Sequence, residues 1–260
     1  KENLVLVLGA GISVPFGVPT WESLLQRLMV FTIEKDSRAS NILAKLFNGV
    51  FSPNPIIAGR YLQSYFQENN ESFEEAVRQV LYSSVNKHTQ SELMDEIVNF
   101  CVAPGKSPNL NSILTYNFDD ILESAIEKIG IHIPYKSIFG IGMDIKKGEL
   151  PIYHIHGYLP EKGNLTSQNN ITLGEHIYHK QYSDIYSWNN IVQINKFSEN
   201  TCIFIGSSLT DPNIRRLLDI SHTQKGKKKA SHYIFKKRKG ISEIEKKLDA
   251  NSINRYLSFL

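Results

Sequence analysis

The chain has 260 residues, a formal net charge of +3, 41% hydrophobic residues and 21% charged residues. These values are typical of a globular protein with a substantial core, and they exclude a disordered or fibrous chain. No apolar run is long enough to span a bilayer and nothing resembles a signal peptide, so we expect a cytoplasmic protein without membrane contact. Because Lys1 stands almost directly before an apolar run, we expect one domain of a longer protein.

The first apolar run, Leu4–Leu8, has the length of a buried strand and ends at the turn Gly9-Ala-Gly-Ile-Ser13. Glycines in such a turn allow bare backbone N–H groups to approach a phosphate. The dinucleotide fingerprint G-x-G-x-x-G is only partly present, because Val14 occupies the place of the third glycine. For the turn alone two interpretations stay open, a phosphate-binding loop and a tight structural turn.

The segment from Val14 to Trp21 contains Gly17 and two prolines, so it cannot form a regular helix. Thr20 can cap a helix whose apolar side chains begin at Leu24. A rigid loop that carries aromatic side chains therefore lies directly beside the predicted phosphate-binding turn.

Residues 36–108 follow with one helical pattern after another and no convincing strand pattern. Ser72-x-x-Glu75 and Thr89-x-x-Glu92 both fit capping boxes, which mark helix starts. We predict that this block is a helical insertion that folds over the sheet edge and lies against the nucleotide site as a lid.

Further apolar runs of strand length occur along the rest of the chain, at Ser112–Thr115, Pro151–Ile155, Thr201–Ile205 and Ser231–Phe235. A helix is predicted from near Asp119 to Gly130. Residues 159–200 form a second helical excursion, with helices predicted over Glu175–Ser183 and Ile185–Phe197. Strands that alternate with helices predict an α/β fold, a Rossmann-like parallel sheet with helices on both faces, formed by residues 1–260 as a single domain.

Three polar motifs come directly after predicted strands: the turn at Gly9, Asn117-x-Asp119 and Gly206-Ser207-Ser208. Because ligands of open α/β sheets bind at the carboxyl ends of strands, these motifs can line one crevice. Taken alone, Asn117 and Asp119 could be ordinary capping residues, although Asp120 is the better candidate for the helix cap.

His154 and His156 form His-x-His on a strand pattern, so both point to one face if the strand persists. They could be packed core histidines, or metal ligands together with His176 and His179. For His156, which precedes Gly157, a catalytic base is the favoured interpretation. His154 is expected to support the strand.

The ordered motifs resemble those of the sirtuin family. Gly-Ala-Gly-Ile-Ser with the later Gly17-Val-Pro, Thr115-Tyr-Asn-Phe-Asp119, His156-Gly and Gly206-Ser-Ser-Leu correspond to sirtuin motifs that surround NAD. The resemblance implies that Asn117 and His156 are catalytic, that Asp119 binds the nicotinamide carboxamide and that Trp21 covers the nicotinamide. It implies further contacts to NAD from Gly9, Ala10, Gly11, Ser13, Gly206, Ser207 and Ser208.

Two departures from the sirtuin pattern limit the range of possible functions. The sequence contains only Cys101 and Cys202, so the four-cysteine zinc site of sirtuin deacylases cannot be built from it and we expect no metal. Glu22 stands where sirtuins carry an arginine. Basic runs near residues 225–229 and 236–239 could meet nucleic acid, but without interleaved aromatics we interpret them as solvated segments.

Without a zinc ribbon, the motifs most resemble the sirtuin-like domains of bacterial antiphage defence proteins. That resemblance implies an NAD glycohydrolase that releases nicotinamide and ADP-ribose and so depletes NAD. It also implies a homo-oligomer and control by a sensor domain or partner outside this chain. The alternatives are an NAD-dependent protein deacylase and a non-catalytic module that binds NAD or ADP-ribose.

Overall fold

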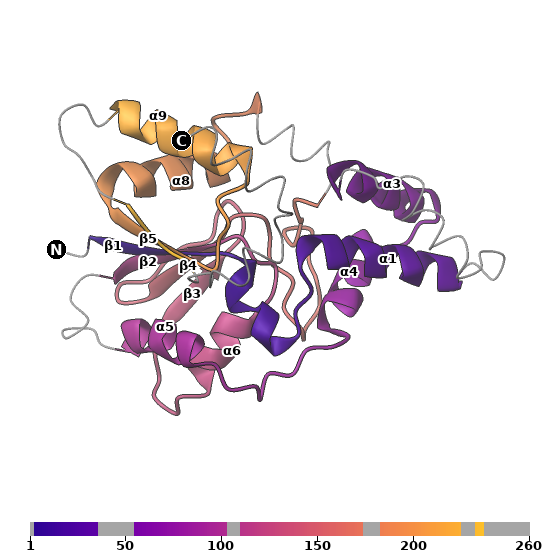
Figure 1. The fold of residues 1–260 in the computed structure, drawn as a ribbon, viewed down its shortest axis with the longest axis horizontal. Helices are drawn as coiled ribbons and strands as arrows, with labels where there is room; N and C mark the ends of the chain where they lie inside the picture. Colours follow the sequence, from indigo (N-terminus) through magenta and orange to yellow (C-terminus); the bar gives the residue numbers. More distant parts are fainter. Residues whose placement is uncertain (1–2, 36–54, 103–109, 174–182, 225–231, 237–260) are drawn as a thin grey trace, which may run out of the picture.

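Six parallel strands form one sheet in the order β3-β4-β2-β1-β5-β6, seen edge-on in Figure 1. The computed structural model describes residues 3–35, 55–102, 110–173, 183–224 and 232–236. The strands are β1 (Leu4–Leu8), β2 (Leu110–Thr115), β3 (Tyr135–Ile138), β4 (Leu150–His154), β5 (Thr201–Ile205) and β6 (Tyr233–Phe235). The predicted α/β fold with a Rossmann-like parallel sheet is confirmed.

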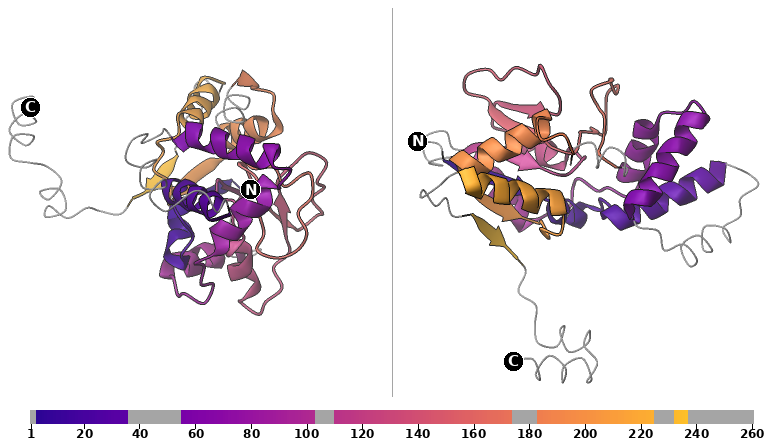
Figure 2. Two further views of the ribbon diagram at one scale, coloured as in Figure 1. Left: turned by 90° about the vertical axis from the view of Figure 1, so that its right-hand side faces the viewer. Right: turned by 90° about the horizontal axis from the view of Figure 1, so that it is seen from above.

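Helices cover both faces of the sheet and one of its ends. Figure 1 shows α8 and α9 over one face and α5 and α6 over the other, while α1, α3 and α4 form a group beyond the carboxyl ends of the strands; Figure 2 agrees. The helices are α1 (Trp21–Lys35), α3 (Pro55–Glu68), α4 (Phe73–Tyr82), α5 (Glu92–Val102), α6 (Ile121–Glu127), α8 (Trp188–Glu199) and α9 (Pro212–Gln224), with short 3₁₀ turns η1 (Ala10–Ile12) and η2 (Val14–Phe16).

The central strand β1 divides the core into two layers. Its side chains alternate: Leu6 and Leu8 pack into the layer under α5 and α6, whereas Val5 and Val7 pack into the layer under α8 and α9. All four side chains are fully buried. A strand covered on both faces needs apolar side chains at every position, which is why the run Leu4–Leu8 shows no polar alternation.

Three predicted helix starts can be compared with the structure. Thr20 Oγ1 accepts a hydrogen bond from Ser23 N–H, and Ser72 Oγ accepts one from Glu75 N–H, so both predicted caps are confirmed. The predicted cap Thr89 is wrong. Ser91 Oγ accepts the N–H of Met94 instead, because α5 begins at Glu92.

The predicted strands agree with the structure except at their ends. β2 begins at Leu110 rather than Ser112, and β4 covers Leu150–His154 rather than Pro151–Ile155. β3 at the sheet edge was not predicted. In the second excursion α8 spans Trp188–Glu199, while nearly all of the helix predicted over Glu175–Ser183 lies outside the described residues.

Within the described residues, no helix combines the length and the apolar character that crossing a membrane requires.

We expect Gly206→Ala to destabilise the protein strongly. Gly206 has φ +67°, and a Cβ there would lie 2.8 Å from Ile12 N. Gly142 is the matched control, since its φ is +80° but nothing lies within 4 Å of an added Cβ. The left-handed backbone alone should cost Gly142→Ala about 1–2 kcal/mol of unfolding free energy, and the clash should at least double that loss at Gly206. Urea unfolding measures both variants; equal losses would contradict the close packing.

Candidate functional site

The turns that follow β1 and β5 pack backbone against backbone. Gly11 N–H donates to Gly206 O at 2.9 Å. A Cβ on Gly9 would lie 2.8 Å from Gly206 O, and a Cβ on Gly11 would lie 2.8 Å from Gly206 Cα. The contact between the two turns therefore requires these glycines. A structural reason for the glycines thus exists in addition to any role in binding a ligand.

The expectation that the first turn presents a row of bare N–H groups is wrong. The N–H groups of Gly9, Gly11, Ile12 and Ser13 all donate to backbone carbonyls within or beside the turn. Of this turn, only the N–H of Ala10 has no hydrogen-bond partner among the described residues, and Ala10 is exposed. A phosphate at this turn would thus meet the Ala10 N–H first.

Three predicted site residues from the first two motifs form one buried network. Asn117 Nδ2 donates to Ser13 Oγ at 3.0 Å and to Gly9 O at 3.2 Å, and Ser13 Oγ donates to Asp119 Oδ1 at 3.0 Å. Exposed fractions are 0% for Ser13, 8% for Asn117 and 5% for Asp119. Asn117 Oδ1 accepts no hydrogen bond from the described residues, so this oxygen remains for a ligand.

Asp119 lies directly before the N-cap of α6 and carries a perturbed carboxyl group. Its Oδ1 accepts the N–H of Ile121 at 3.1 Å as well as the Ser13 hydroxyl. Burial raises the pKa of Asp119 to about 6, although these two hydrogen bonds oppose the shift. Asp120 occupies the N-cap position of α6, as predicted, but its side chain makes no capping hydrogen bond, and its carboxylate pairs with Lys87 Nζ at 2.7 Å.

The helical block touches the site turn through the end of α4. Asp120 N–H donates to the Tyr82 hydroxyl oxygen at 2.9 Å, and the Tyr82 hydroxyl donates to Leu159 O at 2.8 Å. Asn86 N–H donates to Phe16 O at 2.8 Å, directly after the first turn. The described part of the predicted insertion therefore contacts the two segments that follow Ser13 and Asn117 in the chain.

His156 is partly buried beside the turn after β5, next to Tyr116 and Asp211. Its Nε2 is 4.0 Å from Asp211 Oδ2, and the Tyr116 ring meets it edge-on with centroids 5.0 Å apart. Burial lowers the pKa of His156, while Asp211 opposes this shift. The imidazole is therefore neutral at neutral pH and can accept a proton.

The condition under which both histidines would share one face of a strand is not met, because β4 ends at His154 and a turn follows. Gly157, which follows His156, is required by close backbone packing. It has φ +106°, and an added Cβ would lie 2.2 Å from Asn170 O.

His154, at the end of β4, contacts the backbone of the turn that carries Asn117. His154 Nε2 lies 2.7 Å from Glu123 Oε1, and Nδ1 lies 3.2 Å from Asn117 O. Glu123 is not among the site residues predicted from the sequence. A usable signal was present, since Glu123 stands next to Leu122 and three residues before Ile126, on the apolar face of a short helix.

The remaining predicted contacts lie at the same end of the sheet. The Trp21 ring at the start of α1 lies 6.1 Å from the Phe118 ring, measured between centroids. Ser207 Oγ accepts the Leu209 N–H, and Ser208 Oγ lies 2.6 Å from Thr210 Oγ1, so both serines shape the tight turn after β5.

The described ranges contain no group of three or more His, Cys, Asp or Glu side chains arranged to hold a metal ion. Cys101 on α5 and Cys202 on β5 are buried, and neither forms a disulfide among the described residues. His176 and His179, the other half of the alternative histidine set, lie outside the described residues, as do the basic runs at 225–229 and 237–239.

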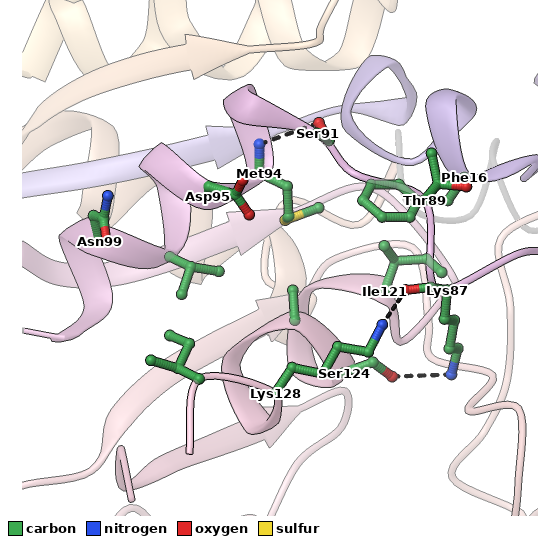
Figure 3. A pocket seen from close by; sticks show the side chains of 13 residues that line it. Phe16, Lys87, Thr89, Ser91, Met94, Asp95, Asn99, Ile121, Ser124 and Lys128 are labelled. Carbon is green, nitrogen blue, oxygen red and sulfur yellow. Dashed lines mark hydrogen bonds between the residues drawn. The ribbon is translucent and has the colours of Figure 1, made fainter. Parts of the chain in front are cut away.

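A separate pocket of about 290 Å³ lies between η2, α5 and α6 (Figure 3). Phe16, Met94 and Ile121 give it an apolar wall, and Lys87 and Ser124 meet at one end. None of the predicted site residues lines this pocket.

Residues 111–256, more than half of the chain, match the SIR2-like domain family. The chain belongs to this family. Its members are in general NAD-dependent enzymes, which agrees with the resemblance to sirtuins. No curated protein matches the chain. The matched range contains Asn117, His156 and Gly206 but not the first turn, which the structure connects to it through Ser13 and Gly11.

Asp119→Asn tests the perturbed carboxyl group. Because the folded pKa, about 6, exceeds the ordinary value of 3.8, ionised Asp119 costs stability that is absent below pH 4 and complete above pH 6. Relative to the parent protein, Asp119→Asn should therefore gain up to roughly 3 kcal/mol of unfolding free energy between pH 4 and pH 7. Asp144→Asn, at an exposed aspartate, is the control. A pH-independent difference between Asp119→Asn and the parent would contradict the burial of this charge.

Proposed function

We propose that this SIR2-like domain is an NAD glycohydrolase that cleaves the nicotinamide–ribose bond and yields nicotinamide and ADP-ribose. The observation that carries the proposal is the buried network in which Ser13 and Asp119 hold the Asn117 amide with its Oδ1 unpaired. Family membership supports NAD as the substrate.

The residues at the site suit this cleavage. The nicotinamide ring of NAD carries a positive charge and becomes a neutral base when its bond to ribose breaks. The reaction therefore needs no general acid. It needs a group that orients the ribose or water and a base that accepts one proton. Asn117 Oδ1 would accept a hydrogen bond from the ribose or from the attacking water. Neutral His156 would accept the proton as the oxygen of water bonds to the anomeric carbon and the glycosidic electron pair leaves with nicotinamide.

The remaining contacts follow the order of the motifs. Exposed Ala10, with its unpaired N–H, and the adjoining Gly11 would face the pyrophosphate, and Ser207 and Ser208 would face the adenosine ribose. Trp21 would cover the nicotinamide, and Asp119 would bind its carboxamide. These roles are supported by the resemblance and by the common position of the turns at the carboxyl end of the sheet.

We also propose that NAD depletion by this domain serves antiphage defence, in a homo-oligomer controlled by a sensor domain or partner protein. The support for this role is the resemblance of the motifs to bacterial defence proteins and the small number of cysteines.

Asn117→Ala and His156→Ala should each abolish release of nicotinamide from NAD supplied without any peptide. Loss of a positioned base or orienting group typically lowers kcat by 10²–10⁴-fold. His222→Ala, which changes an exposed histidine on α9, is the control and should keep the parent rate. Chromatography of the products measures nicotinamide and ADP-ribose.

The same assay separates the alternatives. Nicotinamide release that requires an acylated peptide would indicate a deacylase, and tight NAD binding without turnover would indicate a sensor module. Parent-like turnover in His156→Ala would overturn the assignment of the base.

Chelator should leave NAD cleavage unchanged. The leaving group departs without Lewis-acid assistance in the proposed chemistry, and His156 is assigned as a base rather than a ligand. The measurement compares turnover of tag-free protein before and after EDTA treatment, together with elemental analysis. Activity that is lost to EDTA and restored by zinc would contradict this assignment.

A further inference from the structure

Glu123 and His154 form a polar pair inside the apolar layer beneath α6. Both are almost completely buried, with exposed fractions of 4% and 1%. Neither residue has a part in the chemistry proposed above. From their contacts we infer that Glu123 and His154 are positioning residues that hold the Asn117 turn in place for NAD cleavage, an inference that rests on the proposed function.

A continuous chain of hydrogen bonds connects the pair to Asn117. Ser137 Oγ on β3 donates to Glu123 Oε1 at 2.8 Å, Glu123 Oε1 lies 2.7 Å from His154 Nε2, and His154 Nδ1 lies 3.2 Å from Asn117 O. The chain crosses β3, α6, β4 and the turn after β2. Four separate segments therefore meet at the backbone of the proposed catalytic asparagine.

The direction of the last hydrogen bond does not depend on how the pair shares its proton. A carbonyl oxygen only accepts, so His154 Nδ1 must carry the hydrogen that meets Asn117 O. The other proton lies between Nε2 and Glu123 Oε1, and in either place the carboxyl group fixes the ring and its tautomer. Glu123 thus acts on Asn117 only through His154.

Asn117 is otherwise held from the opposite side. Its N–H donates to Thr115 Oγ1 at 3.1 Å, and its side-chain amide donates to Ser13 and Gly9. His154 supplies the contact from β4, the strand that leads to His156 two residues later. The hydrogen bond from His154 to Asn117 therefore fixes the two proposed catalytic residues relative to each other.

Stability alone does not account for Glu123. Its Oε2 is buried and has no hydrogen-bond partner among the described residues. An unpaired carboxylate oxygen in an apolar layer destabilises a fold, and a well-packed apolar pair in place of both Glu123 and His154 would be tolerated at least as well. The carboxyl group is explained by its effect on His154. It fixes the orientation of the imidazole ring, as carboxylates do for functional histidines in other proteins.

The test compares Glu123→Gln with Glu127→Gln in the purified chain. Glu127 lies one helical turn further along α6 and accepts a hydrogen bond from Tyr135, away from Asn117. Glu123→Gln should lower kcat for NAD cleavage at least 10-fold and change KM less than about 3-fold, because orientation rather than binding is lost. Because glutamine keeps the size of Glu123 and an oxygen that can accept a hydrogen bond, the variant's midpoint of urea unfolding should stay close to that of the parent. Glu127→Gln should keep the parent kcat and KM.

A second variant and a signal that is independent of turnover complete the design. His154→Phe keeps a ring beside Tyr158 but removes the donor to Asn117. Because Glu123 acts through His154, the double variant with Glu123→Gln and His154→Phe should cleave NAD no more slowly than His154→Phe alone. In protein labelled with ¹⁵N-asparagine, the backbone and side-chain amide signals of Asn117 should move in Glu123→Gln and stay in place in Glu127→Gln.

Unchanged kcat and unchanged Asn117 signals in Glu123→Gln would overturn the inference. So would parallel losses of kcat, affinity for NAD and stability, which would show a structural role only. If the parent protein does not cleave NAD, the proposed function fails by itself, and the Asn117 signals alone then decide whether the pair positions this residue.

Discussion

The site depends on one close contact, the packing of the turn after β1 against the turn after β5. At Gly9, Gly11 and Gly206 the two backbones approach so closely that a single Cβ would displace one of them. This approach turns the chain after β1 into short 3₁₀ turns and delivers the Ser13 hydroxyl to Asn117. The glycines thus place Ser13, and Ser13 in turn places the amide on which the proposed chemistry depends.

The order of the strands explains why this contact and the polar groups coincide. In the order β3-β4-β2-β1-β5-β6, the strand β2 lies on one side of β1, and β5, which comes later in the chain, lies on the other side of β1. Such a reversal leaves an opening at the carboxyl ends of the strands, where ligands of open α/β sheets bind. The turns after β1, β2 and β5 are therefore adjacent for topological reasons, and their sequences need only provide the polar groups.

The parts of the fold that could be predicted are those in which local pattern and tertiary environment agree. Leu4–Leu8 and Thr201–Ile205 were predicted to the residue, because buried parallel strands are apolar throughout. β3 was missed, since Tyr135–Ile138 is a short edge strand with Lys136 exposed and no continuous apolar run. The motifs predicted which residues would cluster but not how, because the end of β4 at His154 is decided by tertiary contacts.

The buried carboxyl groups show where stability and the site conflict. Asp119 holds Ser13 and accepts the Ile121 N–H at the start of α6, yet burial raises the pKa of its carboxyl, which means that the folded protein resists its ionisation. Glu123 lies beneath the same turn with one oxygen unpaired, and its negative charge adds to the shift at Asp119. His154 opposes the shift at Asp119, and it is hydrogen-bonded to Glu123 and to Asn117 at once. The electrostatic balance of the turn and the position of Asn117 are therefore set by the same imidazole, so neither can change without the other.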